Sequence, residues 1–494
     1  MESNWINAGG IIPSGWQLVP LKALLLNDKA ISVGVMYPGE HLDGGVPLIK
    51  VGDVTNGEIL KTPDSRISFL VDEEYKRTRL VGNELLITLV GNPGECVIVE
   101  PHMEGWNAAR ALAVLRFKDP EIRYWLKLII QSKPSRHIID SRLNTTVQKT
   151  LNLKDVKELP ILMPPEKIRD NLCCYYYRLE NKATLNRQIN QTLEQMAQAL
   201  FKSWFVDFDP VVDNALDAGF FEQDLEFPDE LLRRVEARKA ARENADFKPL
   251  PDAVRQLFPA AFEECAEPSN GFCGWVPQGW PVKTCEEVSK KIGMGPFGSN
   301  IKVSTFVEDG VPVISGTHLR KILLEDHDYK YITEEHAAKI KNSCVYRGDI
   351  IFTHAGNIGQ VSLIPEESEY ERYMISQRQF YMRPDNQKIK GSYLACFFHS
   401  HDGQHKLLAN ASQTGVPSIA RPSTHLKSIT LIIPKMNVQN IFDSYIMVWN
   451  AKIMKARENI INLTKLRDTL LPKLISGELR LSGSEVDTAD EVLA

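Results

Sequence analysis

The chain has 494 residues, of which 43% are hydrophobic and 24% are charged, and its formal net charge at pH 7 is -5. This is an ordinary globular composition with room for two or three domains. No apolar run is long enough to span a membrane and no signal-peptide pattern opens the chain, which excludes membrane-spanning and secreted classes. The eight cysteines show no CxxC spacing, so we expect free thiols in a cytoplasmic protein.

The acidic residues are concentrated in two places. One is the segment 207–267, and the other is the tail that starts at Ser482. The rest of the chain is mildly basic. This distribution permits a phosphate-binding face despite the negative total charge.

Residues 1–160 consist of short β-rich segments broken by turn residues. Examples are "GVPLIKVGDV" from Gly45 and "GNELLITLVGNPGECVIVEP" from Gly82. Such runs, bounded by Gly, Pro, Asn and Asp, are typical of an irregular mixed β-domain with small helices.

A long helix is predicted next, over residues 166–205. Pro164 and Pro165 precede it, at a place where proline is tolerated, and no Gly or Pro follows until Pro210. At 1.5 Å per residue this helix would be about 60 Å long, so it needs a second long helix to cover its apolar seam. The predicted seam consists of Ile168, Leu172, Tyr175, Leu179, Ile189, Leu193, Met196, Leu200 and Trp204.

The second half of the chain repeats the first. An acidic, proline-punctuated connector, with one charged helix expected over residues 229–244, leads to "GVPVISGTHL" from Gly310 and "GDIIFTHAGNIGQVSLIP" from Gly348. A second long helix is predicted over residues 442–475. Its seam consists of Phe442, Tyr445, Trp449, Ile453, Ala456, Ile460, Leu463, Leu466, Leu470 and Leu474. A shift of 270 residues superimposes Lys157 on Lys427 and Pro164 on Pro434, which indicates a duplicated unit.

Three motifs carry a resemblance to a known family. They are "MAQALFKSWFVDFDPV" from Met196, "LFPAAFEE" from Leu257 with the following "GWVPQGW", and "LRDTLLPKLISGEL" from Leu466. With them the chain resembles the specificity subunits of type I restriction-modification systems, and the resemblance covers nearly its whole length.

The resemblance implies an α+β fold with internal duplication and pseudo-two-fold symmetry. Two mixed α/β target-recognition domains would be separated by a long antiparallel two-helix coiled coil. The expected boundaries are 1–160 for the first domain, 161–209 for the first helix, 210–274 for the connector, 275–432 for the second domain, 433–481 for the second helix and 482–494 for an acidic, disordered tail.

The resemblance also implies a non-catalytic, DNA-sequence-recognising subunit, each domain reading one half of a bipartite double-stranded DNA site. Two modification subunits would dock on the helices and methylate adenine, and motor-nuclease restriction subunits would join them. The chain itself would bind no cofactor, whereas the complex would use S-adenosylmethionine, and ATP with Mg for cleavage. The alternative is a coiled-coil scaffold or a stand-alone DNA-binding regulator without enzyme partners.

Motifs for catalysis are missing, because no P-loop, NPPY-like tetrapeptide or Rossmann glycine pattern in its usual context occurs. A nuclease site built from Asp64, Glu74 and Lys76 is the rival hypothesis. The second unit has "ITEEHA" in place of "VDEEYK", without the lysine, and helix N-caps at Asp72 and Thr333 would explain both copies. A metal site at His399, His401 and His405 is a further alternative, but the first unit has "IQSKPSRH" there.

Two regions in each unit are predicted to contact DNA. One is the turn "VGNPG" with its counterpart "HAGNIG", and the other is the basic, amide-rich stretch from Ser132 with its counterpart from His399. A plain hairpin turn and a plain exposed loop would explain the same residues. The predicted DNA-binding residues are Asn92, Lys133, Arg136, His137, Arg142, Asn144, Lys149, His354, Asn357, His401, His405, Lys406 and Arg421.

Overall fold

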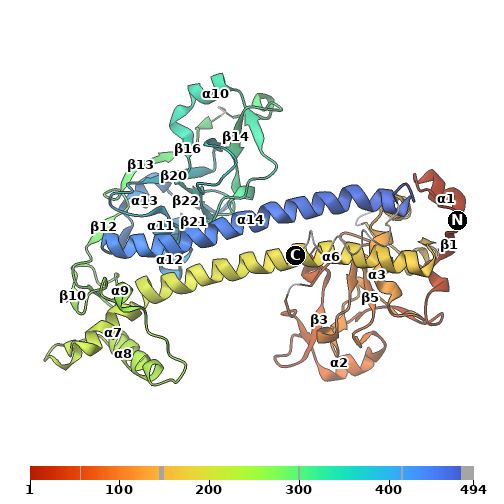
Figure 1. Cartoon of the computed structure of the whole chain (residues 1–494), viewed down its shortest axis with the longest axis horizontal. Helices are drawn as coiled ribbons and strands as arrows, with labels where there is room; N and C mark the ends of the chain where they lie inside the picture. The colour runs from red at the N-terminus through yellow and green to blue at the C-terminus, as the bar shows by residue number, and fades with distance from the viewer. Residues whose placement is uncertain (56, 60, 144–148, 299–300, 413–414, 480–494) are drawn as a thin grey trace. The chain divides into compact units, whose positions relative to one another are not determined.

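A computed structural model describes residues 1–494 with the exception of 56, 60, 144–148, 299–300, 413–414 and 480–494. The chain divides into two compact units. Unit 1 consists of Met1–Thr184 and Ile460–Ala494, and unit 2 consists of Leu185–Asn459. Two long helices, α6 (Glu166–Phe201) and α14 (Met436–Ile475), each contribute one segment to each unit (Figure 1).

Unit 1 is built on a four-stranded antiparallel sheet with the strand order β2-β8-β5-β6. Its strands are Ile31–Val33, Leu112–Leu115, Leu85–Thr88 and Cys96–Ile98. A smaller sheet combines β4 (Arg66–Ile67), β3 (Val46–Ile49) and β7 (Asn107–Ala108), and β1 (Gln17–Pro20) pairs with β9 (Pro160–Met163). The helices of this unit include α2 (Phe69–Glu74), α3 (Ile122–Ile130), α4 (Lys133–Ser141) and α5 (Leu153–Lys157).

The central strands of unit 1 bury both of their faces. Leu85 and Ile87 of β5 lie in the core shared with α3, whereas Leu86 lies in a second core on the other side of the sheet. Because successive side chains of a strand point to opposite faces, a continuous apolar run is required here. This explains why these segments show no polar alternation.

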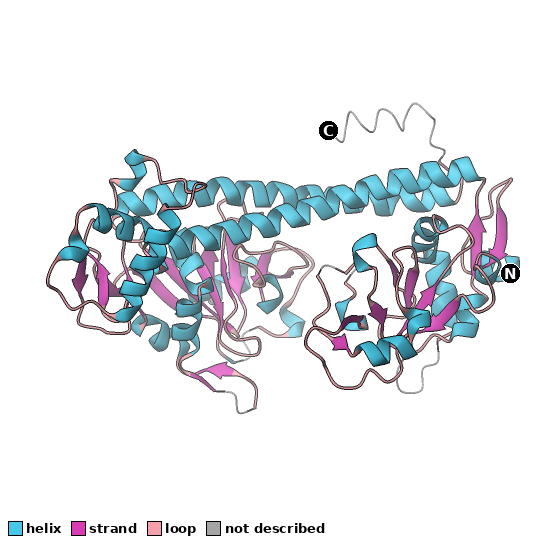
Figure 2. Ribbon diagram, turned by 90° about the horizontal axis from the view of Figure 1, so that it is seen from below, coloured by secondary structure: helices cyan, strands magenta, loops and turns pink. Residues whose placement is uncertain are grey.

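Unit 2 has corresponding sheets, seen beside helices in Figure 2. The strand order β13-β20-β17-β18 combines Ser289–Met294, Gln379–Pro384, Ile350–Thr353 and Val361–Leu363. The order β15-β14-β19-β16 combines Lys330–Ile332, Val311–Ile314, Arg372–Ile375 and Cys344–Tyr346. Three two-stranded pairs complete the sheets: β12 (Val282–Thr284) with β23 (Thr430–Ile432), β21 (Ala411–Ser412) with β22 (Ser418–Ile419), and β10 (Phe262–Glu264) with β11 (Trp275–Pro277). The helices α10 (Glu334–Lys339), α11 (Gly391–His399), α12 (His401–Leu408) and α13 (Pro422–Ser428) connect them.

The pairing registers of the two units agree. Val46 pairs with Ile67 in unit 1, and Val311 pairs with Ile332 in unit 2. The strand β3 then runs parallel to β7 as β14 runs parallel to β19. The β-domain expected from the sequence is therefore present in each unit with the same strand order around its centre.

The ends of the long helices differ from the prediction. The α-helical part of α6 ends at Phe201, and a π-helical turn, Lys202–Val206, follows it. Phe208 then adopts a left-handed conformation with φ of 48° and ends the helix before α7 (Asp209–Asp217). The second helix begins at Met436, ahead of the predicted start at Phe442.

The predicted seams are partly wrong. Ile168, Ile189 and Met196 of α6 and Tyr445 and Leu466 of α14 are exposed. The buried positions of α6 instead include alanines, and they are Leu172, Tyr176, Leu179, Ala183, Leu193, Ala197 and Phe201. The prediction favoured large apolar side chains, whereas small side chains let neighbouring segments approach closely. Within unit 2 the two helices pack antiparallel. Phe201 at the end of α6 contacts Phe442 near the start of α14, whereas Glu194, earlier in α6, pairs with Arg457, later in α14.

The connector is folded, and its buried apolar side chains belong to the main hydrophobic core of unit 2. Besides α8 (Asp229–Arg242), close to the predicted helix, it contains α7 and α9 (Asp252–Arg255). Asp213 and Asp217 of α7 bind Arg238 and Arg242 of α8, with nitrogen–oxygen distances of 2.5 and 2.6 Å, and Asp209 binds Arg234 in the same way. Phe208 packs with other aromatic side chains of the connector, Phe262 and Phe272.

One predicted helix cap is correct and the other is wrong. The hydroxyl of Thr333 accepts from His336 N and caps α10. The cap of α2 is Ser68, one helical turn before Asp72, which is buried and binds Arg79. Ser68, and not Asp72, therefore corresponds to Thr333, which shifts the alignment of α2 with α10 by four residues. The feature that the two helices share is the capping hydroxyl and not the pair of glutamates.

Candidate nucleic-acid interface

The predicted turns are tight hairpins at equivalent places in the two units. Turn 1 (residues 90–94) joins β5 to β6, and turn 2 (residues 355–359) joins β17 to β18. Two glycines in each turn adopt φ values of +83° to +88°, which only glycine adopts without strain. The side chains of Asn92 and Asn357 at the tips are exposed. Nδ2 of Asn92 donates to Oε2 of Glu95 at 3.2 Å.

The second predicted region lies directly beside each turn. Val90 forms a β-bridge with Thr150, and Ala355 forms the corresponding bridge with Ser418. Leu151 N donates to Leu89 O and Ile419 N donates to His354 O, both at 2.8 Å. The structure therefore brings the two candidate regions together into one surface in each unit.

A short helix completes this surface. Ser132 and Ser400 are the N-caps of α4 and α12. One residue further on, Lys133 and His401 are exposed, and one helical turn beyond them His137 and His405 are exposed as well. The rings of His401 and His405 lie nearly parallel, 6.5 Å apart. Each helix thus presents a pair of side chains that can carry positive charge or donate hydrogen bonds.

A polar side chain from each helix holds the turn in place. In unit 1, Nη1 of Arg136 donates to Pro93 O at 3.0 Å, and its Nη2 lies 3.4 Å from Oδ1 of Asn92. In unit 2, Nε2 of Gln404 donates to Gly359 O at 3.0 Å. Arg136 is therefore primarily a positioning residue for turn 1, with a half-exposed side chain.

Two further predicted DNA-binding residues have hydrogen-bond partners within the protein. Nη1 of Arg142 donates to Asp155 O at 3.0 Å. The ring of His354 is half-buried, and its Nε2 forms a hydrogen bond with Gln377 O at 3.1 Å. The sequence could not indicate these partners, because both lie on other segments of the chain.

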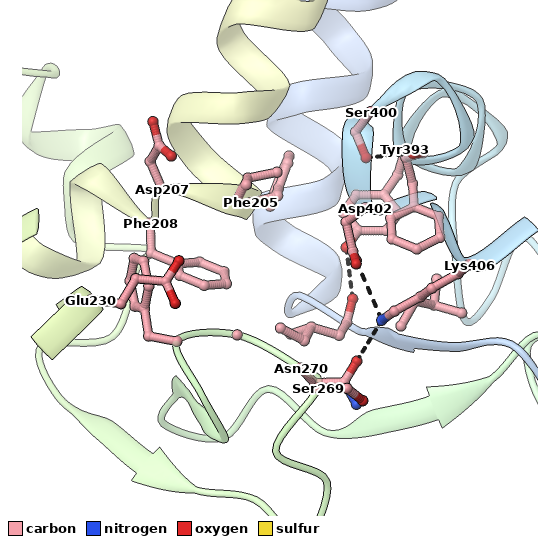
Figure 3. A pocket seen from close by; sticks show the side chains of 16 residues that line it. Phe205, Asp207, Phe208, Glu230, Ser269, Asn270, Tyr393, Ser400, Asp402 and Lys406 are labelled. Atoms are coloured by element: carbon pink, nitrogen blue, oxygen red, sulfur yellow. Dashed lines mark hydrogen bonds and ion pairs between the residues drawn. The ribbon is translucent and has the colours of Figure 1, made fainter. Parts of the chain in front are cut away.

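Lys406 is the clearest correction. Its ammonium group donates to Oδ1 of Asn270 at 2.8 Å and pairs with Asp402 at 3.3 Å (Figure 3). It also donates to Thr430 O at 3.2 Å. It lines a cavity of about 230 Å³ that is also bordered by Phe205 and Phe208. Its side chain is 15% exposed and neutralised by Asp402, so we remove Lys406 from the DNA-binding set.

The other predicted residues that the structure describes remain candidates for DNA contact. Asn144 lies outside the described residues. Lys149 precedes the bridge at Thr150, and Arg421 is the left-handed N-cap of α13. The exposed candidates are Asn92, Lys133, His137, Lys149, Asn357, His401, His405 and Arg421.

Sequence reasoning missed three exposed side chains next to the turns. Arg110 lies between β7 and β8, and Gln377 and Arg378 lie between β19 and β20. A signal was available, because "NAARAL" and "MISQRQ" occupy the same place between repeated strands. It was overlooked because the flanking residues of these two segments differ.

Comparison with known proteins gives a consistent result. A family model described as "Type I restriction modification DNA specificity domain" matches residues 277–466. The HindI specificity subunit of Haemophilus influenzae is 25% identical over 449 residues, covering 88% of this chain and 94% of that protein. The MjaIX specificity subunit of Methanocaldococcus jannaschii is 24% identical over 496 residues, covering 96% and 95%.

The chain is similar to the specificity subunits of type I restriction-modification systems. Specificity subunits are the non-catalytic parts of these systems. A crystal structure of the S subunit of a type I system from M. genitalium has the same fold, with a TM-score of 0.50 and 14% identity over 93% of this chain and 96% of that one.

In this chain, the residues of the rival metal and nuclease sites have other partners. Lys76 pairs with Glu73 at 3.0 Å and Asp64 pairs with Lys61 at 2.7 Å. Nε2 of His399 hydrogen-bonds to Val361 O at 2.8 Å, and burial lowers the pKa of His399. No cluster of three or more metal-ligating side chains occurs in the described ranges, and no helix within them is long and apolar enough to cross a membrane.

Proposed function

We propose that this chain determines the DNA sequence on which a type I restriction-modification complex acts, and that each of its two domains reads one half of a bipartite site. The observation that carries this proposal is the pair of equivalent surfaces. Each consists of a glycine turn, a bridged loop and the exposed side of α4 or α12. Their backbones correspond, whereas some of their exposed side chains, such as Lys133 and His401, differ. A common backbone with different side chains suits two readers of two different half-sites.

The chemistry of both surfaces supports a DNA partner. Their exposed side chains are Asn, Lys, His and Arg, which bind phosphates as cations or pair with base edges as hydrogen-bond donors. One carboxylate near the surface of unit 2, that of Asp402, is neutralised by Lys406. The net negative charge of the chain does not oppose binding, because it lies mainly in the connector and the tail.

The partners we propose are two modification subunits, which would methylate adenine with S-adenosylmethionine, and motor-nuclease subunits that would use ATP and Mg. The long helices are their proposed docking sites, as parts of an antiparallel coiled coil between duplicated domains. Exposed apolar side chains on these helices support docking, because clusters of large apolar side chains on a protein surface often mark a binding site for another protein. They include Leu185, Ile189 and Met196 of α6 and Tyr445, Met447 and Val448 of α14.

A genome-wide map of methylated adenines tests the proposal. Cells that carry the system should show methylation at one bipartite sequence, and deletion of this gene alone should abolish it. Persistence of the same methylated sequence after the deletion would favour the alternative of a scaffold or stand-alone regulator.

A further inference from the structure

The loop that joins the small sheet to the central sheet has the same backbone in both units. Residues 109–111 join β7 to β8, and residues 376–378 join β19 to β20. The N–H of the first loop residue donates to Ile49 O at 2.8 Å in unit 1 and to Ile314 O at 2.9 Å in unit 2. The residue after the loop donates back to the carbonyl of the first, at 2.9 and 3.1 Å.

The third loop residue ties this loop to the hairpin turn. Leu89 N donates to Ala111 O at 2.8 Å, and His354 N donates to Arg378 O at 2.9 Å. Leu89 and His354 immediately precede turns 1 and 2. The loop therefore forms part of the same surface as the turn, and hydrogen bonds on both sides fix its backbone. A side chain on such a loop loses little freedom of its backbone on binding.

Each loop carries one arginine with an available guanidinium group. Arg110 is the second residue of its loop and Arg378 is the third, and both side chains are exposed. A Cβ atom at Gly356 would lie 3.4 Å from Nη1 of Arg378, which places this guanidinium beside turn 2. Within the described part of the chain, neither guanidinium has a hydrogen-bond or ion-pair partner. In this they differ from Arg136 and Arg142, which bind carbonyl groups of the protein.

We propose that Arg110 and Arg378 are specificity-determining residues, each of which reads a guanine in the half-site of its own domain. The inference rests on the proposed function. A planar guanidinium can donate two parallel hydrogen bonds to O6 and N7 of guanine in the major groove, which is the commonest base-specific contact of arginine. The guanidinium groups project from fixed loops, as such a two-pronged contact requires.

A base contact fits the two loops better than a phosphate contact. Phosphate contacts are independent of sequence, so equivalent domains can keep the same residue at the same position for them. Here the second position holds Arg110 or Gln377, and the third holds Ala111 or Arg378, on the same backbone. The two loops therefore have the same backbone but different side chains at these two positions, as expected for residues that read different bases.

The test uses the complex of this chain with its modification subunits and a plasmid library with randomised half-sites. Methylated sequences are selected and sequenced for the wild type and for R110K, R110A, R378K and R378A. R110K retains the charge but loses the paired donors, so the preference for guanine at one position of one half-site should fall roughly 10- to 100-fold. The slope of affinity against salt should stay unchanged for R110K. R378K should act in the same way on the other half-site.

Lys29 provides the matched control. It is exposed in unit 1 and precedes Ile31, which pairs with Leu115 at the end of β8 away from the loop, so K29A should leave the site unchanged. A wild-type half-site without guanine, or R110K and R110A complexes that retain the wild-type site, would overturn the inference. So would a uniform loss of binding by R110A with a smaller salt slope, since this is the behaviour of a phosphate contact. If deletion of the gene leaves methylation unchanged, the proposed function itself fails.

Discussion

Arg383 donates two hydrogen bonds to the buried carboxylate of Asp349, from Nε at 2.8 Å and from Nη2 at 2.7 Å. Arg116 binds the fully buried Glu84 at the equivalent place in unit 1, with 3.1 Å between Nε and Oε1. In both units the arginine also donates to the chain that precedes the acid, at Arg79 O and at Cys344 O. The same buried ion pair therefore links strand β8 to β5 and β20 to β17.

Removal of one partner of this pair should be costly. D349A leaves Arg383 without its buried partner, and we expect unit 2 to lose about 3 kcal/mol of unfolding free energy. Burial raises the pKa of Asp349 even beside Arg383, so the pair as a whole adds little. D349L with R383M should consequently cost less than the sum of the single variants in urea denaturation. D64A, which removes an exposed acid that pairs with Lys61, is the control; equal losses in D64A and D349A would contradict this account.

The aromatic packing of the π-helical turn after α6 should also contribute to the stability of unit 2. Trp204 is 2% exposed and packs against Phe258 and Phe442, with ring centroids 5.0 and 6.1 Å away. W204A should lower the unfolding free energy by about 3 to 5 kcal/mol, because it leaves a large cavity. M196A, on the exposed side of the same helix, should change it by less than about 0.5 kcal/mol. A small loss in W204A, measured by denaturant unfolding, would mean that this aromatic core does not hold the end of the helix.

Unit 2 should lose stability in mild acid. Nδ1 of His318 accepts from Ser315 N at 2.9 Å and its Nε2 bonds to His327 O, so the ring is neutral and has no place for a second proton. Burial, followed by His327, lowers the pKa of His318 below its ordinary value of 6.5. The unfolded chain takes up a proton below pH 6.5 before the folded chain does, so stability falls as the pH drops below that value. Urea midpoints at pH 7.5 and 5.5 should differ less in H318Q than in the wild type, whereas H401Q, at an exposed ring, should keep the wild-type difference.

Charge removal on α4 should weaken DNA binding without unfolding the chain. Lys133 is exposed at the start of the helix, so K133Q should lower affinity for all sequences and reduce the log-log salt slope by about one if it contacts a phosphate. Affinities of the assembled complex for its own site, measured over a range of salt, provide the test. K29Q is the matched control. An unchanged slope with unchanged affinity would exclude Lys133 from the DNA surface.

The features that the sequence predicted best are those that occur in both halves of the chain. The two β-domains, the hairpin turns and the two long helices follow from apolar runs, glycines and the constant offset between halves. The seams were less predictable, because periodicity does not distinguish Tyr175 from Tyr176 and because Ala183 gives no hydrophobic signal. Among the site residues, the prediction for Lys406 was wrong because its partner Asn270 is remote in sequence. Arg110 was missed because the residues that flank it differ from those that flank Arg378.

The most direct test of the account is an exchange of one domain. Residues 10–155 are replaced by the corresponding residues of another specificity subunit with a different methylated sequence, and methylated adenines are mapped in cells that produce the hybrid. The account predicts that one half of the bipartite site changes to that of the donor while the other half stays as it is. A change in both halves, or in neither, would contradict the assignment of one half-site to each domain.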